Sequence, residues 1–559
     1  MPPGDAAELL KTGDERADAG QLVEAAAWWR WGYVKRLPQI RGLAFKHPVQ
    51  ARFMTRKALQ DRMAYEVDKE WPVEVMQANQ DAGAALGFWA DDLKLGQLLG
   101  NLYTQEVAGF YDPDTKELFL IADPPPEGEH AALKQLWDRL TDKQGEQKMI
   151  LAHELDHALA DQHFDLYSLQ ASLKSDEDAT MALSGLVEGE ATVMMMLAIM
   201  SPREQAEFLS SPPEVLAAVM DFVAPLAARF AGGKALREAP QFYRETLLIP
   251  YTRGMHFVLT LLQSGGWAAL DRAYADPPLS SEQLLHPEKY IGQTDPPIAI
   301  SLDAPPPALA GWRLVKQNTL GELSIRILLQ EQLSLSDATA AATGWGGDTY
   351  QVYRKGSERR LLWVSRWDLE SDAREAANAL LARYSAGADS EPPAVVQRGK
   401  TVVVLTHAGA DKEALLDWAF SASWEQKKLP IRPVVAKAAF PAEADPEMAV
   451  LAPAKGIEIP LEPPGTRRIL EAMGVLNGEA VVRAKANASA VCACTLSDGV
   501  GCLHEAIAAN TQWWAANREA VSHPLDIKAI LREARRLNDC VQAFHEARIR
   551  AGLNPAAAP

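Results

Sequence analysis

The segment from Ile150 to Leu159 reads Ile-Leu-Ala-His-Glu-Leu-Asp-His-Ala-Leu, which places two histidines and a glutamate in the order HExxH within an apolar run. Residues four apart lie one above the other on a helix, so the imidazoles of His153 and His157 can converge on one metal ion. Glu154 points to the same side and can reach a water molecule on that ion, as a general base does. The pattern predicts a zinc site on a helix, and with it a hydrolase.

The apolar neighbours of this motif predict that the helix is buried. Three ionisable side chains would then be buried with it, and a bound cation is the usual compensation for that cost. The alternative is an amphipathic surface helix whose histidines and glutamate are solvated. The neighbours that favour burial are Met149, Ile150, Leu151, Leu155 and Leu159.

Composition limits the classes of partner. The chain has 559 residues, too many for one hydrophobic core, and its 48% hydrophobic and 23% charged residues are typical of folded proteins. A formal charge of -18 disfavours binding to nucleic acid or to an anionic membrane. The longest apolar stretch, Met181 to Met200, is interrupted by Glu188 and Glu190, so we expect no integral membrane segment. A peptide or protein substrate is the partner that the family resemblance given below implies.

The cysteines leave the cellular compartment open. Cys492, Cys494, Cys502 and Cys540 all lie near the C-terminus, and an even number in one region favours two disulfides in a periplasmic or extracellular protein. A four-cysteine zinc site is less favoured, because the Cys-x-Cys spacing is tighter than usual. The N-terminus has neither a basic nor an apolar signal region, so we expect no export signal, and free thiols in the cytoplasm are the alternative.

The hydrophobic periodicity predicts an α+β protein with a mainly helical domain around the HExxH motif, which contains a small β-hairpin or sheet. The family resemblance given below implies that this domain is a zincin-like peptidase domain. A small α+β domain and a helical C-terminal domain follow it. The predicted segments are a helical hairpin over 1–40, the peptidase domain over 41–310, the α+β domain over 311–429, a linker rich in proline and alanine over 430–465, and the cysteine-containing helical domain over 466–559.

Within the peptidase domain, residues 48–106 are expected to be helical and residues 107–121 to form a hairpin around an Asp-Pro-Asp turn. An exposed strand there can bind an extended peptide by strand addition, and an ordinary core hairpin is the alternative. In the next domain the pattern predicts two helices and then strand, strand, helix, strand, helix.

A catalytic zinc site needs a third protein ligand. Of the two glutamates in the next apolar segment, Glu188 is favoured over Glu190, because small residues three or four positions away let its face of the helix approach a neighbour closely. Glu190 lies about 200° around that helix, where it is either a supporting group or a paired buried carboxylate. The small residues are Ser184, Gly185, Ala191 and Thr192.

Here the chain resembles the gluzincin metallopeptidases, in which HExxH is followed on a second helix by a glutamate ligand. The string Glu188-Gly-Glu-Ala-Thr192 is similar to the Asn-Glu-Gly-Phe-Ala-Thr of the aminopeptidase branch. The separation from His157, 188 minus 157, is 31 and is longer than in that branch. Val107-Ala-Gly-Phe-Tyr-Asp-Pro113 also resembles a group of uncharacterised bacterial zinc metallopeptidases.

The alternative third ligand is His163. The segment from His153 reads HExxHxxAxxH, close to the metzincin pattern HExxHxxGxxH. In that family the glycine allows a sharp turn that returns the third histidine to the metal, and Ala160 stands in its place here. We therefore favour Glu188, with His163 as a loop residue near the site.

The gluzincin resemblance implies a mechanism. Zinc held by His153, His157 and Glu188 would lower the pKa of its bound water, and Glu154 would take the proton and pass it to the leaving amine. Tyr251 is the favoured donor to the oxyanion, ahead of Tyr243, His256 and His286. Asp161, four residues after His157, is a candidate to orient that imidazole, or else a solvated residue at a helix end.

Two other functional classes stay open on the sequence alone. One is a degenerate zincin that holds zinc for structure and uses its other domains for interaction. The other is an envelope interaction protein without metal, in which the motif is accidental.

Overall fold

The computed structural model describes most of the chain up to residue 432. The chain divides into two compact units, residues 1–128, 144–205 and 231–458 in the first and residues 129–143, 206–230 and 459–559 in the second. The predicted C-terminal domain with its four cysteines, and all but the first residues of the predicted linker, lie outside the described residues. These are residues 2–19, 21–54, 58–59, 73–106, 109–121, 143–216, 234–292, 294–385 and 393–432.

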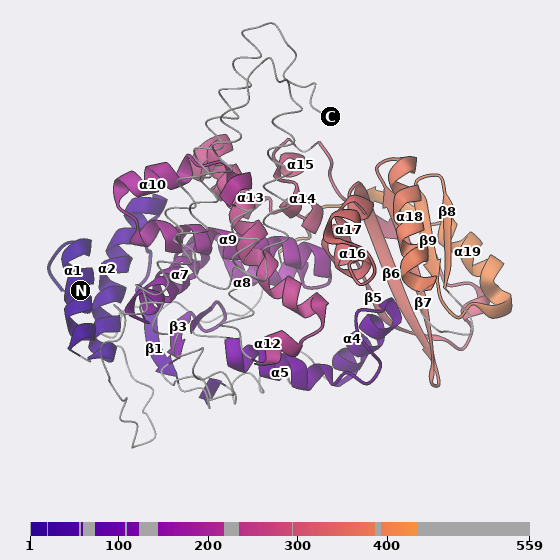
Figure 1. Ribbon diagram of the computed structural model, residues 1–559, viewed down its shortest axis with the longest axis horizontal. Helices are drawn as coiled ribbons and strands as arrows, with labels where there is room; N and C mark the ends of the chain where they lie inside the picture. Colours follow the sequence, from indigo (N-terminus) through magenta and orange to yellow (C-terminus); the bar gives the residue numbers. More distant parts are fainter. Residues whose placement is uncertain are drawn as a thin grey trace, which may run out of the picture. The chain divides into compact units, whose positions relative to one another are not determined.

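The described part of the chain is α+β, as expected, with many helices and three small sheets (Figure 1). It begins with the two helices predicted near the N-terminus, α1 (Ala6–Asp18) and α2 (Leu22–Arg41). Asp5 and Glu8 form a capping box at the start of α1, and Gly42, with a φ of 76°, ends α2.

The first sheet has the strand order β1-β3-β2. Its strands β2 (Gly109–Asp112) and β3 (Glu117–Ile121) are the predicted hairpin. β1 (Gln50–Met54) runs parallel to β3, so the prediction of helix throughout 48–106 was wrong there. Five residues that pair with a strand more than sixty positions away carry too little local periodicity to identify. The helices of this stretch are α4 (Val73–Leu86) and α5 (Leu95–Glu106).

Long helices form the centre of this region. They are α7 (Lys143–Phe164), α8 (Leu166–Leu173), α9 (Glu177–Ile199) and α13 (Gln241–Ala275), which is broken at Gly265 and Gly266. The shorter helices are α10 (Pro202–Leu209), α12 (Lys234–Glu238), α14 (Ser281–Leu285) and α15 (Pro287–Ile291).

Helices α9 and α13 touch backbone to backbone. A Cβ atom on Gly189 would lie 2.3 Å from the carbonyl of Gly254, and one on Gly254 would lie 2.1 Å from the carbonyl oxygen of Gly185. No side chain fits at these positions, so the glycines set the separation of the two helices. This is the close approach that the small residues beside Glu188 predict.

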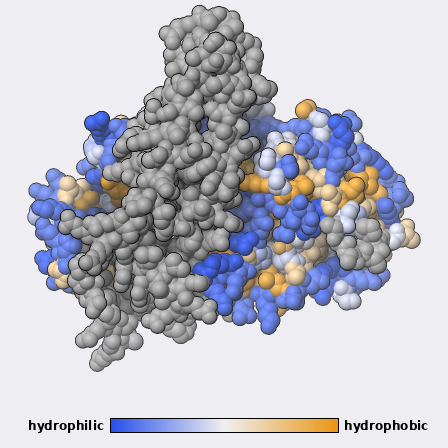
Figure 2. Space-filling view, viewed as in Figure 1, coloured by the Kyte–Doolittle hydropathy of each residue, from blue (hydrophilic) through white to orange (hydrophobic). Residues whose placement is uncertain are grey.

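Among the described ranges, α9 is the one helix long and apolar enough to cross a membrane by length and composition. The surrounding protein buries 72% of the most apolar stretch of α9, as is typical of a core helix in a folded domain. Figure 2 shows hydrophilic residues over most of the visible described surface. The structure is therefore consistent with the expectation of no integral membrane segment.

The region after residue 310 is built on a five-stranded antiparallel sheet with the order β5-β6-β7-β9-β8. The helices and strands predicted there are present, and two edge strands, β5 and β8, were missed. Edge strands bury little, so their sequences lack a clear alternation. The elements are β5 (Arg313–Asn318), α16 (Gly321–Leu329), α17 (Leu335–Ala342), β6 (Trp345–Lys355), β7 (Glu358–Trp367), α18 (Glu370–Ser385), β8 (Ala394–Arg398), β9 (Thr401–Leu405) and α19 (Lys412–Phe420).

Side chains alternate between two cores on the faces of this sheet. Trp363 and Val404 pack with α16, α17 and α18, whereas Leu362 and Val403 pack with α19. The first core also includes Ala82, Leu86 and Phe88, which come from the segment before residue 310. A second connection is the pairing of β4 (Ile298–Ser301) with β10 (Ser423–Gln426). Residues before and after the predicted domain boundary at 310 thus pack against each other.

Candidate metal centre

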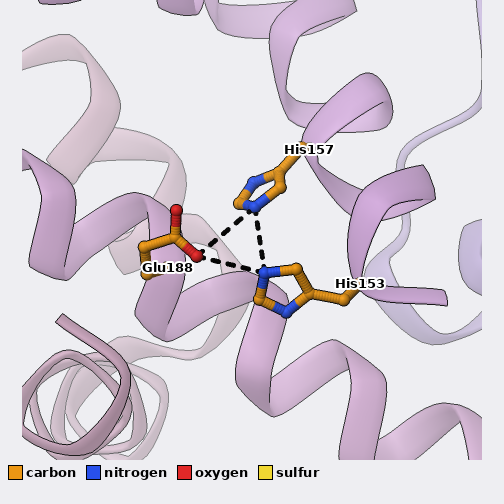
Figure 3. A group of neighbouring side chains, drawn as sticks. All are labelled: His153, His157 and Glu188. Atoms are coloured by element: carbon orange, nitrogen blue, oxygen red, sulfur yellow. Dashed lines mark hydrogen bonds and ion pairs between the residues drawn. The ribbon is translucent and has the colours of Figure 1, made fainter. Parts of the chain in front are cut away.

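Three side chains from two helices converge on one point (Figure 3). His153 and His157 come from α7 and Glu188 from α9. Glu188 Oε2 lies 3.0 Å from His153 Nε2 and 3.5 Å from His157 Nε2, and the two Nε2 atoms are 3.0 Å apart. The structure therefore brings together the three residues predicted as ligands.

The arrangement fits a tetrahedral zinc ion. Ligand atoms bound about 2.0–2.2 Å from one tetrahedral ion lie roughly 3.3–3.6 Å from each other. The distance of 3.5 Å found here falls in this range, and the two of 3.0 Å are slightly shorter. Two imidazoles and one carboxylate are also a common donor set of catalytic zinc. The His153 side chain is 11% exposed and the Glu188 side chain 26%, so one side of the cluster is open to solvent.

The cluster is strongly coupled electrostatically. Burial alone would lower the pKa of His157, but the charge and hydrogen bond of Glu188, together with the charges of Glu154 and Asp156, outweigh it and raise that pKa to about 9. Burial would likewise raise the pKa of Glu188, yet the two histidines hold it far below its ordinary value. At neutral pH the protein alone therefore holds a proton on His157, at the place where a cation would bind.

Glu154 is held by the β-hairpin. Its Oε2 accepts a hydrogen bond of 2.7 Å from the backbone N–H of Tyr111 on strand β2. The glutamate is buried, and its charge acts on His157 in the cluster. Sequence reasoning found the hairpin and the glutamate but not the bond between them.

Tyr251 on α13 lies against the cluster. Its ring stacks on the ring of His153, with the centroids 6.0 Å apart. The negative charge of Glu188, then burial and the charge of Glu154, raise the pKa of the Tyr251 hydroxyl well above its ordinary value. The hydroxyl interacts with Glu188, and the residue as a whole is 40% exposed. Gly254 lies one helical turn after Tyr251 on α13. Its contact with α9 places Tyr251 beside the cluster.

The other oxyanion candidates have different surroundings. Tyr243 stacks on Trp89 at 5.3 Å, and His286 bonds Glu322 at 2.9 Å. His256 is buried five residues beyond Tyr251 on the same helix. Tyr251 stacks on His153, one of the predicted ligands.

His163, the alternative third ligand, is directed elsewhere. α7 continues unbroken to Phe164, and His163 Nε2 bonds the carbonyl oxygen of Ala44 at 2.8 Å. Without the sharp turn that a glycine at position 160 would permit, the chain does not bring His163 back to His153 and His157.

The two supporting carboxylates are both paired. Glu190 bonds Arg41 of α2 and the hydroxyl of Tyr274, and all three residues are buried. Of the two alternatives predicted for Glu190, the structure therefore shows the paired buried carboxylate. Asp161 Oδ2 accepts from the Tyr111 hydroxyl at 2.8 Å and from Lys116 Nζ at 2.7 Å. Asp161 is thus neither solvated nor bonded to His157, and both predictions for it were wrong.

A second cluster of acidic side chains surrounds a lysine. Glu282, Asp295 and Asp368 present oxygens close enough to hold an ion. Lys289 Nζ lies 2.6 Å from Glu282 and Asp295 and 3.2 Å from Asp368, so an ammonium occupies the position. We assign this group as an ion-pair network.

Comparison with known proteins adds one match. Residues 311–416 match a domain of unknown function (DUF8575), which coincides with the five-stranded sheet and its helices. No curated protein and no solved structure matches the chain. The match lies outside α7, α9 and α13, the helices that carry the candidate metal centre.

Proposed function

We propose that the protein is a gluzincin-type zinc metallopeptidase with His153, His157 and Glu188 as ligands. The observation that carries this proposal is the convergence of those three donors within 3.5 Å of each other. The HExxH motif accounts for two of them, and the third arrives from a separate helix, as in gluzincins.

The surrounding residues suit peptide hydrolysis. Zinc, when bound, supplies a Lewis acid that polarises the peptide carbonyl and makes a water molecule acidic. Glu154 takes the proton of the attacking water on one carboxylate oxygen while the Tyr111 amide holds the other. It then passes the proton to the leaving amine. Tyr251 keeps its own proton over the working pH range and donates a hydrogen bond to the developing oxyanion.

Incubation of the purified full chain with a mixed peptide library, read by mass spectrometry, tests this function. We expect cleavage that a chelator stops and that zinc restores, because the metal is required for attack. A control incubation carries the chelator already saturated with zinc. Cleavage that persists in excess chelator would contradict the proposal, and zinc binding without any cleavage would favour the degenerate zincin.

Zinc affinity is expected to rise with pH. A ligand imidazole must be neutral, and in the metal-free protein His157 stays protonated up to about pH 9. Below that pH each zinc releases one proton from His157, so affinity should rise about tenfold per pH unit between pH 7 and 8.5. A histidine with the ordinary pKa of about 6.5 would give a flat profile there. Competition titration with a chromogenic chelator at several pH values distinguishes the two.

A further inference from the structure

Three buried residues join the β-hairpin to the metal helix, and we call them the hairpin clamp: Tyr111, Lys116 and Asp161. The Tyr111 hydroxyl and Lys116 Nζ both donate to Asp161 Oδ2, at 2.8 and 2.7 Å. Asp161 Oδ1 accepts from the backbone N–H of Leu166 at 3.0 Å. The side chains of Lys116 and Asp161 are 1% and 0% exposed.

The clamp is connected to the general base through Tyr111. The Tyr111 amide bonds Glu154 and its hydroxyl bonds Asp161. These two carboxylates lie seven residues apart on α7, which is two helical turns and about 10.5 Å along one face. Tyr111 on the edge strand β2 is thus bonded to α7 at two positions along the helix axis.

The turn of the hairpin presents Lys116 to this pair. Lys116 has a φ of 61°, rare for a residue with a side chain, and its amide bonds the carbonyl of Asp112 at 2.8 Å. The Asp112 side chain accepts from the Asp114 amide and the Thr115 hydroxyl, both at 2.8 Å. These three hydrogen bonds stabilise the turn, from which Lys116 Nζ reaches Asp161.

A buried ion pair contributes little net stability, and its best established role is to fix one arrangement among several. From these contacts we infer that the hairpin clamp is a positioning device for catalysis. It holds the Tyr111 amide on Glu154 and so directs the free oxygen of that carboxylate toward the attacking water. This inference rests on the proposed function, because it assigns Glu154 as the general base.

The test compares wild type with Lys116→Met combined with Asp161→Asn. The double variant removes both charges, so no lone buried charge is left to unfold the protein, and asparagine keeps an acceptor for the clamp. Lys148→Met is the matched control, because Lys148 also pairs with an aspartate, Asp14, and lies on α7. Each protein is assayed for zinc content, kcat and KM, and hydrogen exchange of residues 109–112.

We expect the double variant to hold one zinc per chain with an unchanged cobalt-substituted spectrum, to exchange faster at 109–112, and to lose about 10- to 100-fold in kcat with KM nearly constant. The control should match wild type. Unchanged exchange, or faster exchange with full kcat, would overturn the clamp while leaving the peptidase proposal intact. Wild-type protein without zinc-dependent cleavage would instead overturn the peptidase proposal, and the catalytic role of the clamp with it.

Discussion

Glu154→Gln is expected to lower kcat for peptide cleavage by about 10²–10⁴-fold while the protein keeps its zinc. Glutamine matches glutamate in shape and can still accept a hydrogen bond from the Tyr111 amide. It cannot take a proton from water at neutral pH. The expected loss corresponds to about 3–5 kcal/mol of transition-state stabilisation. The measurement is steady-state kinetics on a library-derived peptide, with metal content determined on the same sample.

The matched control is Glu15→Gln. Glu15 lies on α1 in an exposed pair with Lys11, and its substitution should leave kcat and zinc content unchanged. Wild-type kcat in the zinc-loaded Glu154→Gln protein would exclude the proposed mechanism, whatever the metal content of the site.

Removal of Glu188 has the second large expected effect. Glu188→Ala should weaken zinc binding by at least about 100-fold, because losing an outer-shell partner alone costs roughly 10- to 100-fold and Glu188 is one of three direct ligands. His163→Ala is the paired variant, and it should bind zinc as wild type does, since His163 bonds Ala44 instead. Competition titration at one fixed pH measures both affinities.

The two variants together decide between the gluzincin and metzincin interpretations. If His163→Ala lost zinc and Glu188→Ala kept it, α7 would have to bend after His157 in the metal-bound protein. The third ligand proposed here would then be wrong.

The sequence predicted the parts of the site that depend on helical spacing. His153, Glu154 and His157 follow from residues four apart on one face. Glu188 was predicted from the gluzincin resemblance, and the small residues around it supported that choice. Tyr251 could be named only through the family resemblance, because its place depends on the glycine contact between α9 and α13. The spacing of residues within one helix can be predicted from neighbouring positions in the sequence, whereas the place where two helices cross cannot.

The unpredicted features all join distant segments. Arg41 reaches Glu190 from 149 positions away, and Lys116 reaches Asp161 from 45. Neither lysine nor arginine carries a local signal for burial, since both are usually exposed. Strands β1, β5 and β8 were missed or misassigned for a related reason, because edge strands depend on pairing more than on their own pattern.

The metal content of the purified full chain tests the central claim most directly. Mass spectrometric metal analysis of wild type and His157→Ala, both prepared without added metal and then dialysed against equimolar zinc, gives the number of ions per chain. We predict one zinc per wild-type chain and its loss in His157→Ala, because two ligands do not retain the ion at that concentration. Only a trace of zinc in wild type, with the same trace in His157→Ala, would contradict a zinc centre at His153, His157 and Glu188.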